Sequence, residues 1–491
     1  MRFAVLLLVV CFIYDAAARR RFSRHHGLGS PKLSKVYDLP KDQWFEQHLD
    51  HSNPTDGRMW KQRYFMNGEY YKEGGPIFLL IGGEGPAEAK WLVEGEMIDN
   101  AKKYGAMCFQ LEHRYYGKSH PTQDMSVKNL VYLSSEQALA DLAYFIEAMP
   151  KMYNMTQNSK WIVFGGSYPG SLAAWMRYKY PHLVHGAVSA SGPLLAQADF
   201  QQYFIVVEES LRTHSQGCID AIGAAMKQVH IMLRHRIGQQ SLAKLFKFCD
   251  PIDSGKTTTK DIANLYESLA DTFADVVQYN KDNRNSSVYT IDDICNVLVD
   301  EKRGVPVNRF AEVSNMLLKK NKEECLDYKY SKMIDEMRNV TWPGNEAPGG
   351  RQWTYQTCTE FGFFQTSTAR PNLFSETFPV DFYLTMCQDI FGPRFLHTVE
   401  IGVERTNTIY GALDLPNVIS NVVFVHGSID PWHALGVTKS NNPEAPAIFI
   451  NGTAHCANMY PPSKKDLPQL TQARKQISNY IGQWLEKKVY W

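Results

Sequence analysis

One segment constrains the fold more than any other: residues 161–170, WIVFGGSYPG, in which a short apolar strand runs into a glycine-rich turn and then a helix. A serine at such a turn, here Ser167, must adopt a strained backbone conformation, and small neighbours allow the turn to close. The usual pattern has glycine two residues before and two residues after the serine. This chain has Gly165 before it, but Pro169 after it and Gly170 one place later. Because proline is well tolerated where a helix starts, we expect the turn to form despite this departure.

The sequence on either side of this segment alternates short apolar runs with amphipathic stretches, a pattern typical of strands and helices in succession. Such alternation predicts a mostly parallel sheet covered by helices on both faces. The helix that opens at Ser134 carries Gln137 three residues on, the pattern of a capping box. The predicted strands are 76–81, 106–111, 161–164, 186–189, 422–425 and 447–450, and the covering helices are 134–146, 171–180 and 470–485.

The middle of the chain has a different pattern. Helical periodicity dominates between the two groups of strands, as at 262–277 and 310–319. A length of 491 residues would suggest three domains at about 150 residues each. One sheet domain interrupted by a helical insertion explains the returning strands better. We therefore predict an α/β fold whose parts are 37–193, a helical, disulfide-containing cap at 194–404, and 405–491.

The N-terminus has the features of a secretory signal peptide. Arg2 precedes an apolar run at 3–14, and small residues follow at 16–18, so residues 1–18 are predicted to be removed. A basic leader at 19–36 follows and is a candidate for further trimming. The apolar run is about 12 residues, whereas a membrane-spanning helix needs roughly 20. We expect no stable membrane insertion, and secretion or delivery to the lysosome.

The cysteines agree with an oxidising compartment. Eight remain after the signal peptide, which allows up to four disulfides, and six of them lie between Cys218 and Cys387. Cys108 lies in a strand-like apolar run, and the sequence does not decide whether it is a buried free thiol or part of a disulfide. Four Asn-x-Ser/Thr acceptors for N-glycosylation occur, at Asn154, Asn285, Asn339 and Asn451.

Charge and motif spacing exclude several classes of function. The chain has 52 basic and 51 acidic residues with no basic stripe, so a nucleic-acid partner is not expected. No HExxH or comparable ligand spacing indicates a metal site. The loop IGGEGP at 81–86 lacks the rest of a GxGxxG fingerprint, and no P-loop Lys-Ser/Thr pair is present. We expect no cofactor.

A serine nucleophile needs a base and a carboxylate that orients the base. In this architecture the order along the chain is Ser, then Asp or Glu, then His. Asp430 lies in the loop after one predicted strand, and His455 in the loop after the next. His426 and His433 compete with His455, but neither is on a separate loop. The predicted catalytic triad is Ser167, Asp430 and His455.

Two segments are predicted to form an oxyanion hole. The backbone N–H of Tyr168 lies where the helix after Ser167 begins. The 81–86 loop supplies a second donor from the backbone of Gly83 and Glu84. The Glu84 side chain has two interpretations that the sequence leaves open: it binds an ammonium group of the substrate, or it pairs with Arg114.

The chain resembles a known family through the ordered strings GGEGP, EHRYYGKS, YLSSEQALADL, GGSYPGSLAAW, WTYQTCTEFGFF, GSIDPW and TAHCANMY. They are similar to those of the secreted and lysosomal serine peptidases that include prolylcarboxypeptidase, the lysosomal dipeptidyl peptidase and thymus-specific serine protease. GSLAAW and WTYQTCTEFGF most resemble the thymus-specific branch. The resemblance runs from about Phe45 to Trp484.

This resemblance implies an α/β-hydrolase fold with a helical cap, and it places the family's catalytic triad on the three residues already chosen. It also implies a serine peptidase, exopeptidase-like, that prefers peptide bonds near proline or small residues. Trp353 and Trp432 are expected to contact the substrate. A lipase or esterase of the same fold and a non-catalytic peptide-binding relative are the alternatives, and a homodimer formed through the cap is left open.

Overall fold

The computed structural model describes residues 28–156, 159–253, 255–281, 289–344 and 346–487. The predicted signal peptide, the first half of the basic leader (19–27) and Asn285 lie outside the described residues. Among the residues that are described, no helix combines the length and the apolar character needed to cross a bilayer.

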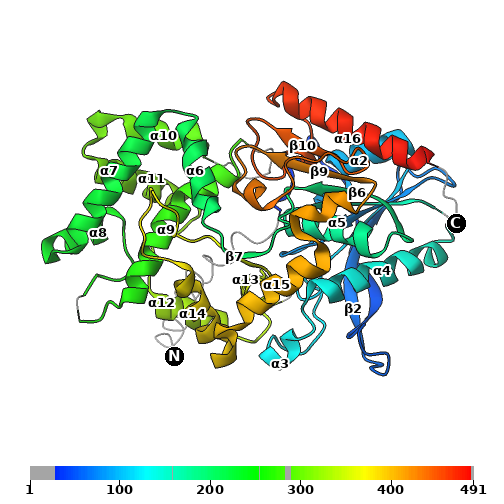
Figure 1. Cartoon of the computed structure of the whole chain (residues 1–491), viewed down its shortest axis with the longest axis horizontal. Helices are drawn as coiled ribbons and strands as arrows, with labels where there is room; N and C mark the ends of the chain where they lie inside the picture. Colours follow the sequence, from blue (N-terminus) through cyan, green and yellow to red (C-terminus); the bar gives the residue numbers. More distant parts are fainter. Residues whose placement is uncertain (1–27, 157–158, 254, 282–288, 345, 488–491) are drawn as a thin grey trace, which may run out of the picture.

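An eight-stranded sheet forms one half of the molecule (Figure 1). Its order is β1-β2-β4-β3-β5-β6-β9-β10, and every pair from β4 to β10 is parallel. The strands are β1 (Gln43–His48), β2 (Met59–Asn67), β3 (Ile77–Ile81), β4 (Met107–Leu111), β5 (Trp161–Gly166), β6 (Val184–Ala190), β9 (Val422–Gly427) and β10 (Ala447–Ile450). All six predicted strands are present.

Helices cover both faces of this sheet, because the central strands are apolar on both sides. On one face, Phe78 and Ile162 pack with Ile477 of α16 (Pro468–Glu486) and with α2 (Glu96–Tyr104). On the other, Leu79 and Val163 pack with residues of α4 (Ser135–Met152) and α5 (Tyr168–Lys179). The predicted layers are therefore confirmed, and Figure 1 shows α16 and α4 on opposite sides.

The first two strands were not predicted. β1 and β2 pair antiparallel at one edge of the sheet, and β2 pairs antiparallel with β4. Alternate residues of β1 are exposed, so this edge lacks the continuous apolar runs that reveal the central strands. The capping box at Ser134 is half formed: its side chain accepts from the backbone N–H of Gln137, whose own side chain donates to Asp50 and Ser52.

Helices form the other half of the molecule (Figure 1). Between β6 and β9 the chain forms α6 (Gln202–Arg212), α7 (Gln216–Leu233), α8 (Arg236–Leu245), α9 (Thr259–Gln278), α10 (Ile291–Val299), α11 (Pro306–Lys320), α12 (Tyr330–Arg338), α13 (Gly350–Gln356), α14 (Val380–Phe391) and α15 (Thr398–Tyr410). A small parallel pair, β7 (Gln197–Asp199) and β8 (Gly362–Phe364), lies among them. The predicted domain limits stay a proposal, and the limit at 404 falls inside α15.

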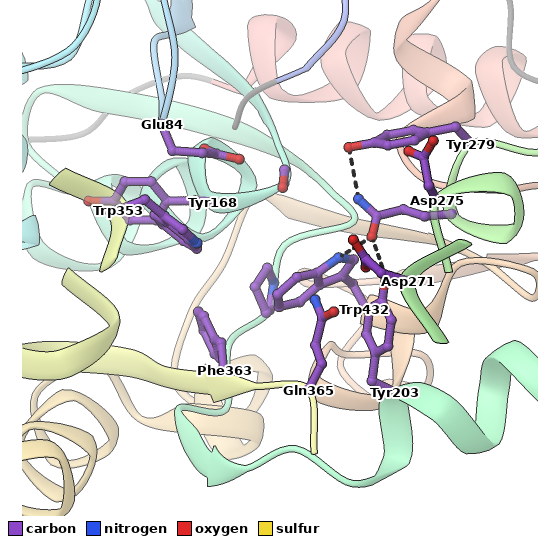
Figure 2. Close-up of a pocket in the computed structure, with 13 residues that line it drawn as sticks. Glu84, Tyr168, Tyr203, Asp271, Asp275, Tyr279, Trp353, Phe363, Gln365 and Trp432 are labelled. Carbon is purple, nitrogen blue, oxygen red and sulfur yellow. Dashed lines mark hydrogen bonds between the residues drawn. The ribbon is translucent and has the colours of Figure 1, made fainter. Parts of the chain in front are cut away.

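Short helices connect these elements. They are α3 (Val127–Leu130), η1 (Ala89–Leu92), η2 (Glu301–Arg303), a π-helix η3 (Thr357–Phe361), η4 (Pro393–Leu396), η5 (Ala412–Asn417), η6 (Pro431–Leu435) and η7 (Ala457–Met459). Two of them, η6 and η7, follow β9 and β10 at the carboxyl edge of the sheet, where the helical half meets the sheet around a cavity (Figure 2).

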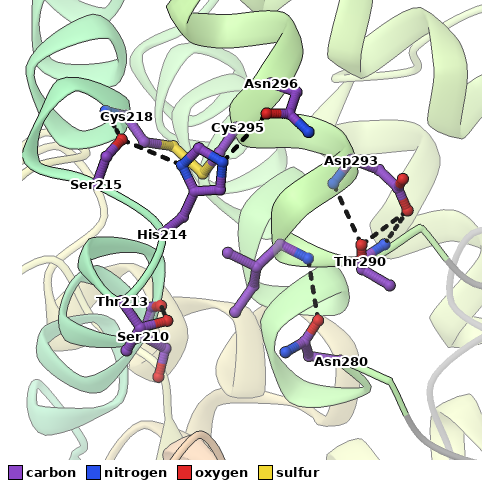
Figure 3. Close-up of a disulfide and its surroundings, with 11 residues drawn as sticks. Ser210, Thr213, His214, Ser215, Cys218, Asn280, Thr290, Asp293, Cys295 and Asn296 are labelled. Carbon is purple, nitrogen blue, oxygen red and sulfur yellow. Dashed lines mark hydrogen bonds between the residues drawn. A yellow bond between two sulfur atoms is a disulfide. The ribbon is translucent and has the colours of Figure 1, made fainter. Parts of the chain in front are cut away.

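Three disulfides crosslink the helical half: Cys218–Cys295, Cys249–Cys325 and Cys358–Cys387. The first joins α7 to α10, and His214 beside it contacts Asn296 at 3.2 Å (Figure 3). Cys108 and Cys456 are buried free thiols. The six cysteines of the 218–387 stretch thus pair among themselves, and no fourth disulfide forms within the described part of the chain.

Candidate active site

Ser167 occupies a sharp turn between β5 and α5. Its backbone has φ 67° and ψ −137°, a combination that is strained for an L-amino acid. The turn leaves no room at Gly165, where an added Cβ would lie 1.9 Å from the carbonyl oxygen of Pro169. Gly170 is equally confined, because a Cβ there would lie 2.5 Å from the carbonyl oxygen of Ala190. The strand-to-helix turn predicted from the sequence is therefore present.

Pro169, which departs from the usual motif, is the second residue of α5. The first turn of a helix has amide groups without a partner in the helix, so the missing N–H of proline costs little there. For this reason the helix begins at Tyr168, three residues before the predicted start at Ser171. The proline ring also contacts Gly83, where an added Cβ would lie 2.3 Å from its Cγ. This contact places the 81–86 loop beside the turn.

Asp430 and His455 form a buried pair. Nδ1 of His455 lies 2.9 Å from Oδ1 of Asp430, and the side chains are 2% and 0% exposed. The same carboxylate oxygen accepts the backbone N–H of Trp432 at 3.0 Å. Burial is the largest single effect and opposes both charges, but the partner's charge, the hydrogen bond between the two side chains and smaller contributions from neighbours together outweigh it. The pKa of Asp430 is therefore lowered, and the pKa of His455 is raised well above its usual value.

The residues that neighbour Ser167 and His455 in the chain are in contact. A Cβ added to Gly166 would lie 3.0 Å from Sγ of Cys456. The backbone N–H of Cys456 donates to Oγ of Ser191, directly after β6, at 2.9 Å. Nε2 of His455, the ring nitrogen that faces away from the carboxylate, is buried and has no hydrogen bond to another described residue. This nitrogen is the atom that a general base would use.

The two competing histidines occupy other environments. His426 is buried at the end of β9 against Gly436, and burial lowers its pKa to about 4, which keeps it neutral. The His433 ring packs against Phe449 at 5.2 Å. Of the three histidines, His455 is the one that hydrogen-bonds to Asp430.

A cavity opens beside Ser167, between the sheet half and the helical half. Figure 2 shows Glu84, Tyr168 and Trp353 on one side of it, with Asp271, Asp275 and Tyr279 on the opposite side. The complete lining is Glu84, Ser167, Tyr168, Pro193, Tyr203, Asp271, Asp275, Gln278, Tyr279, Trp353, Phe363, Gln365 and Trp432. No group of three or more His, Cys, Asp or Glu side chains in the described part of the chain could hold a metal ion.

The predicted substrate-contacting residues Glu84, Trp353 and Trp432 all line this cavity. Pairing of Glu84 with Arg114, one of its two predicted roles, is wrong. The Arg114 guanidinium is fully buried and donates to both carboxylate oxygens of Asp141, at 2.6 and 2.7 Å. Its remaining N–H groups donate to backbone carbonyl oxygens.

Sequence reasoning missed the contribution of α9. This helix was predicted, but nothing indicated that Asp271, Asp275 and Gln278 would line the cavity. Asp271 and Asp275 are four residues apart, so the sequence could have predicted that both carboxylates lie on one face of the helix. Periodicity identifies a shared face, but it does not say which distant strand ends that face will meet.

The mostly parallel sheet of this order, with a strained serine between a strand and a helix, defines the α/β-hydrolase fold. Within that class, the sequence profile of the family Serine carboxypeptidase S28 matches residues 47–477. The chain belongs to this family and is a serine peptidase.

Relatives match over nearly the whole chain. Thymus-specific serine protease of Mus musculus is 35% identical over 475 residues, which cover 95% of this chain and 90% of that protein. The human protein of the same name is 33% identical, with coverages of 98% and 96%. Lysosomal Pro-X carboxypeptidase of Mus musculus is 29% identical, with coverages of 95% and 96%. Of these three relatives, the two thymus-specific serine proteases have the higher identities, as the motifs predicted.

Proposed function

We propose that Ser167 is the nucleophile of an acyl-enzyme mechanism, with His455 as general base and Asp430 as the group that orients it. Ser167 attacks the scissile carbonyl carbon while Nε2 of His455 takes its proton. The same proton then passes to the leaving amine, and water hydrolyses the acyl-enzyme. The observation that carries this proposal is the 2.9 Å contact of His455 with Asp430, beside the strained turn of Ser167.

The oxyanion of the tetrahedral intermediate needs hydrogen-bond donors that are already in place. We assign this role to the backbone N–H of Tyr168, at the N-terminus of α5, and to the backbone at Gly83 and Glu84. The packing of Gly83 against Pro169 supports the assignment, because it brings the loop to the start of the helix.

The substrates we propose are short peptides with proline or a small residue next to the cleaved bond. One of the relatives is named as a Pro-X carboxypeptidase, and rings of Trp353, Phe363 and Trp432 give the cavity aromatic walls suited to a proline ring. Residues of the helical cap line the cavity opposite the sheet half, so we expect folded proteins to be excluded from the cavity. A lipase binds apolar acyl chains, and the carboxylates in the lining of this cavity do not favour such a substrate.

The charge of the cavity favours one end of a peptide. Glu84, Asp271 and Asp275 line it, and none of the described residues in the lining is Lys or Arg. Carboxylates attract an ammonium group and repel a terminal carboxylate, most strongly where water is scarce. We therefore propose that this chain binds the amino-terminal side of its substrate in the cavity and removes a short amino-terminal fragment, in contrast to a carboxypeptidase.

Product mass spectrometry on matched peptides tests both parts of the proposal. Each proline-containing peptide is offered with a free or acetylated amino terminus and a free or amidated carboxyl terminus, to the native enzyme and to Ser167→Ala. We expect cleavage that needs the free amino terminus, tolerates the amide and is lost in Ser167→Ala. Cleavage that needs the free carboxyl terminus would refute the end preference alone. Hydrolysis of acyl esters without any peptide hydrolysis would refute the peptidase.

We also propose passage through the secretory pathway to the lysosome or the cell exterior. The three disulfides and the lysosomal relative support this destination. Asn154, Asn339 and Asn451 are exposed and remain proposed glycosylation sites, and the homodimer remains a prediction.

A further inference from the structure

Gln278, the last residue of α9, contacts both loops that carry the proposed acid and base. Its backbone carbonyl accepts the N–H of His455 at 3.0 Å. Its side-chain Oε1 accepts Nε1–H of Trp432 at 3.0 Å, and the backbone N–H of Trp432 in turn donates to Asp430. One residue of the helical cap is thus bonded to the loop of the base and to the loop of the acid.

Both polar atoms of the Gln278 side chain form hydrogen bonds. Oε1 also accepts the hydroxyl of Tyr203 at 2.7 Å, and Nε2 donates to the hydroxyl of Tyr279 at 2.9 Å. Figure 2 draws these hydrogen bonds as dashed lines from the amide to Tyr203, Trp432 and Tyr279. Because the amide oxygen accepts two bonds while the nitrogen donates one, the orientation of the amide is fixed. Because its side chain forms hydrogen bonds with protein groups, we interpret Gln278 as a residue that holds its neighbours in place.

The position of Gln278 at a helix end adds an electrostatic effect. The last carbonyl groups of a helix have no partner within it and carry partial negative charge. α9 has 20 residues and ends at the carbonyl group that binds His455. This end of the helix therefore favours the positive charge that His455 acquires when it takes the serine proton.

We propose that Gln278 is a positioning residue that ties the cap to the two catalytic loops, so that the cap takes part in catalysis as well as restricting access. This inference rests on the proposed triad. The backbone bond fixes the loop of His455, and the side-chain bond fixes Trp432 and with it the loop of Asp430. A distortion of either loop changes the alignment of Nε2 with Ser167 without removing any catalytic group.

Gln278→Ala separates the two bonds. It keeps the backbone bond to His455 and removes the acceptor for Trp432 and Tyr203. We expect kcat to fall by about 10- to 100-fold, because small misplacements of catalytic groups carry losses of this size. KM should change by no more than about threefold, since the lost interaction acts on the reacting groups.

Gln278→Glu is the conservative variant. Its carboxylate still accepts hydrogen bonds from Trp432 and Tyr203, so kcat should exceed that of Gln278→Ala. It also adds a negative charge near His455, which raises the pKa of the base. The acidic limb of the pH dependence of kcat/KM should therefore move to higher pH, a shift that a purely structural role would not produce.

Asn264→Ala is the matched control. Asn264 is buried on the same helix and donates to the carbonyl oxygen of Tyr328 at 2.9 Å, far along α9 from both loops. It should lower the unfolding midpoint and leave kcat unchanged. A Gln278→Ala enzyme with unchanged kcat, or with a loss that Asn264→Ala reproduces, would overturn the proposal.

If Gln278→Ala fails to fold, Tyr203→Phe decides the question, because it removes a single hydroxyl donor to Oε1. A several-fold fall in kcat supports the proposal and an unchanged kcat overturns it. Labelling of Ser167 by an organophosphonate in the native enzyme separates the two hypotheses: an unlabelled native enzyme refutes the triad itself, whereas a labelled enzyme indifferent to these variants refutes only the role of Gln278.

Discussion

Asp430 and His455 are buried together, and burial alone would leave both uncharged. Their contact reverses this, and the pKa of His455 is raised. A general base must be neutral to accept a proton. Activity should therefore be present above the raised pKa of His455 and be lost as the pH falls through it, so the acidic limb of kcat/KM in the free enzyme lies above pH 6.5.

Replacing the carboxylate gives the first residue-level prediction. Asp430→Asn should lower kcat by about 10⁴-fold, because an amide no longer holds the imidazole in the required tautomer. The acidic limb should also move to lower pH, since the charge that raises the pKa of His455 is gone. Measuring kcat/KM from about pH 4 to 9 checks both. Asp250→Asn, which breaks a pair with Lys332 in the helical half, is the control and should leave the limb in place.

The sequence selects candidate residues most directly where chain order carries the information. Ser167, Asp430 and His455 were selected because each follows a strand in the order that this architecture requires. Pairing between side chains was not predictable in this way. Arg114 binds Asp141 because the fold brings β4 and α4 together, and nothing in the 81–86 loop distinguished that pair from one with Glu84.

At the scale of elements, the turn between β5 and α5 holds Ser167, the proposed nucleophile. Gly165→Ala should lower kcat by about 100-fold or more, because its Cβ would meet the Pro169 carbonyl oxygen at 1.9 Å and displace the first turn of α5. Steady-state kinetics together with the unfolding midpoint test this. The fall in kcat should persist at temperatures at which the variant is fully folded.

The matched change is Gly223→Ala in the middle of α7, where the added Cβ meets only Leu373 at 3.5 Å. It should leave kcat unchanged and stabilise the fold by about 0.5–1 kcal/mol, since alanine favours a helix over glycine. Equal kinetics for the two variants would contradict the proposed role of the turn.

Elements were predictable to the extent that they are apolar on a regular period. The central strands were found because continuous apolar runs indicate burial on both faces, as for β3 and β5. β1 was not predicted because it lies at an edge of the sheet and is exposed at alternate residues, so it lacks a continuous apolar run. The orientation of α9 toward the loops of Asp430 and His455 depends on tertiary packing, which no local period encodes.

For the whole molecule, ionisable groups in the interior make stability depend on pH. Burial raises the pKa of Glu96 to about 8 and of Glu360 to about 7, from 4.5 in the unfolded chain. These carboxyl groups hold protons that the unfolded chain releases, so they stabilise most at low pH and less as the pH rises. Burial lowers the pKa of three histidines to about 4, and these are His113, His185 and His426. The unfolded chain binds protons at these histidines before the folded chain does, so their contribution to stability decreases as the pH falls.

Above pH 6.5 the unfolded histidines no longer bind protons, so the raised pKa values of Glu96 and Glu360 are unopposed and the raised pKa of His455 acts with them. We therefore predict that stability falls as the pH rises above 6.5, with each excess proton on the folded chain changing the free energy of unfolding by about 1.4 kcal/mol per pH unit.

Glu96→Gln tests this balance on the alkaline side. The side chain accepts Nδ2–H of Asn458 at 2.8 Å and is fully buried, so a neutral amide removes the titration while it keeps the volume. Between pH 6.5 and about 8, the free energy of unfolding of the variant, measured with denaturant, should fall less steeply with pH than that of the native protein. The difference between the two slopes should be about 1.4 kcal/mol per pH unit. Glu400→Gln, at an exposed position, should keep the native slope. If Glu96→Gln keeps it as well, the carboxyl group at Glu96 is ionised in the folded molecule throughout this range, and the alkaline loss of stability has another origin.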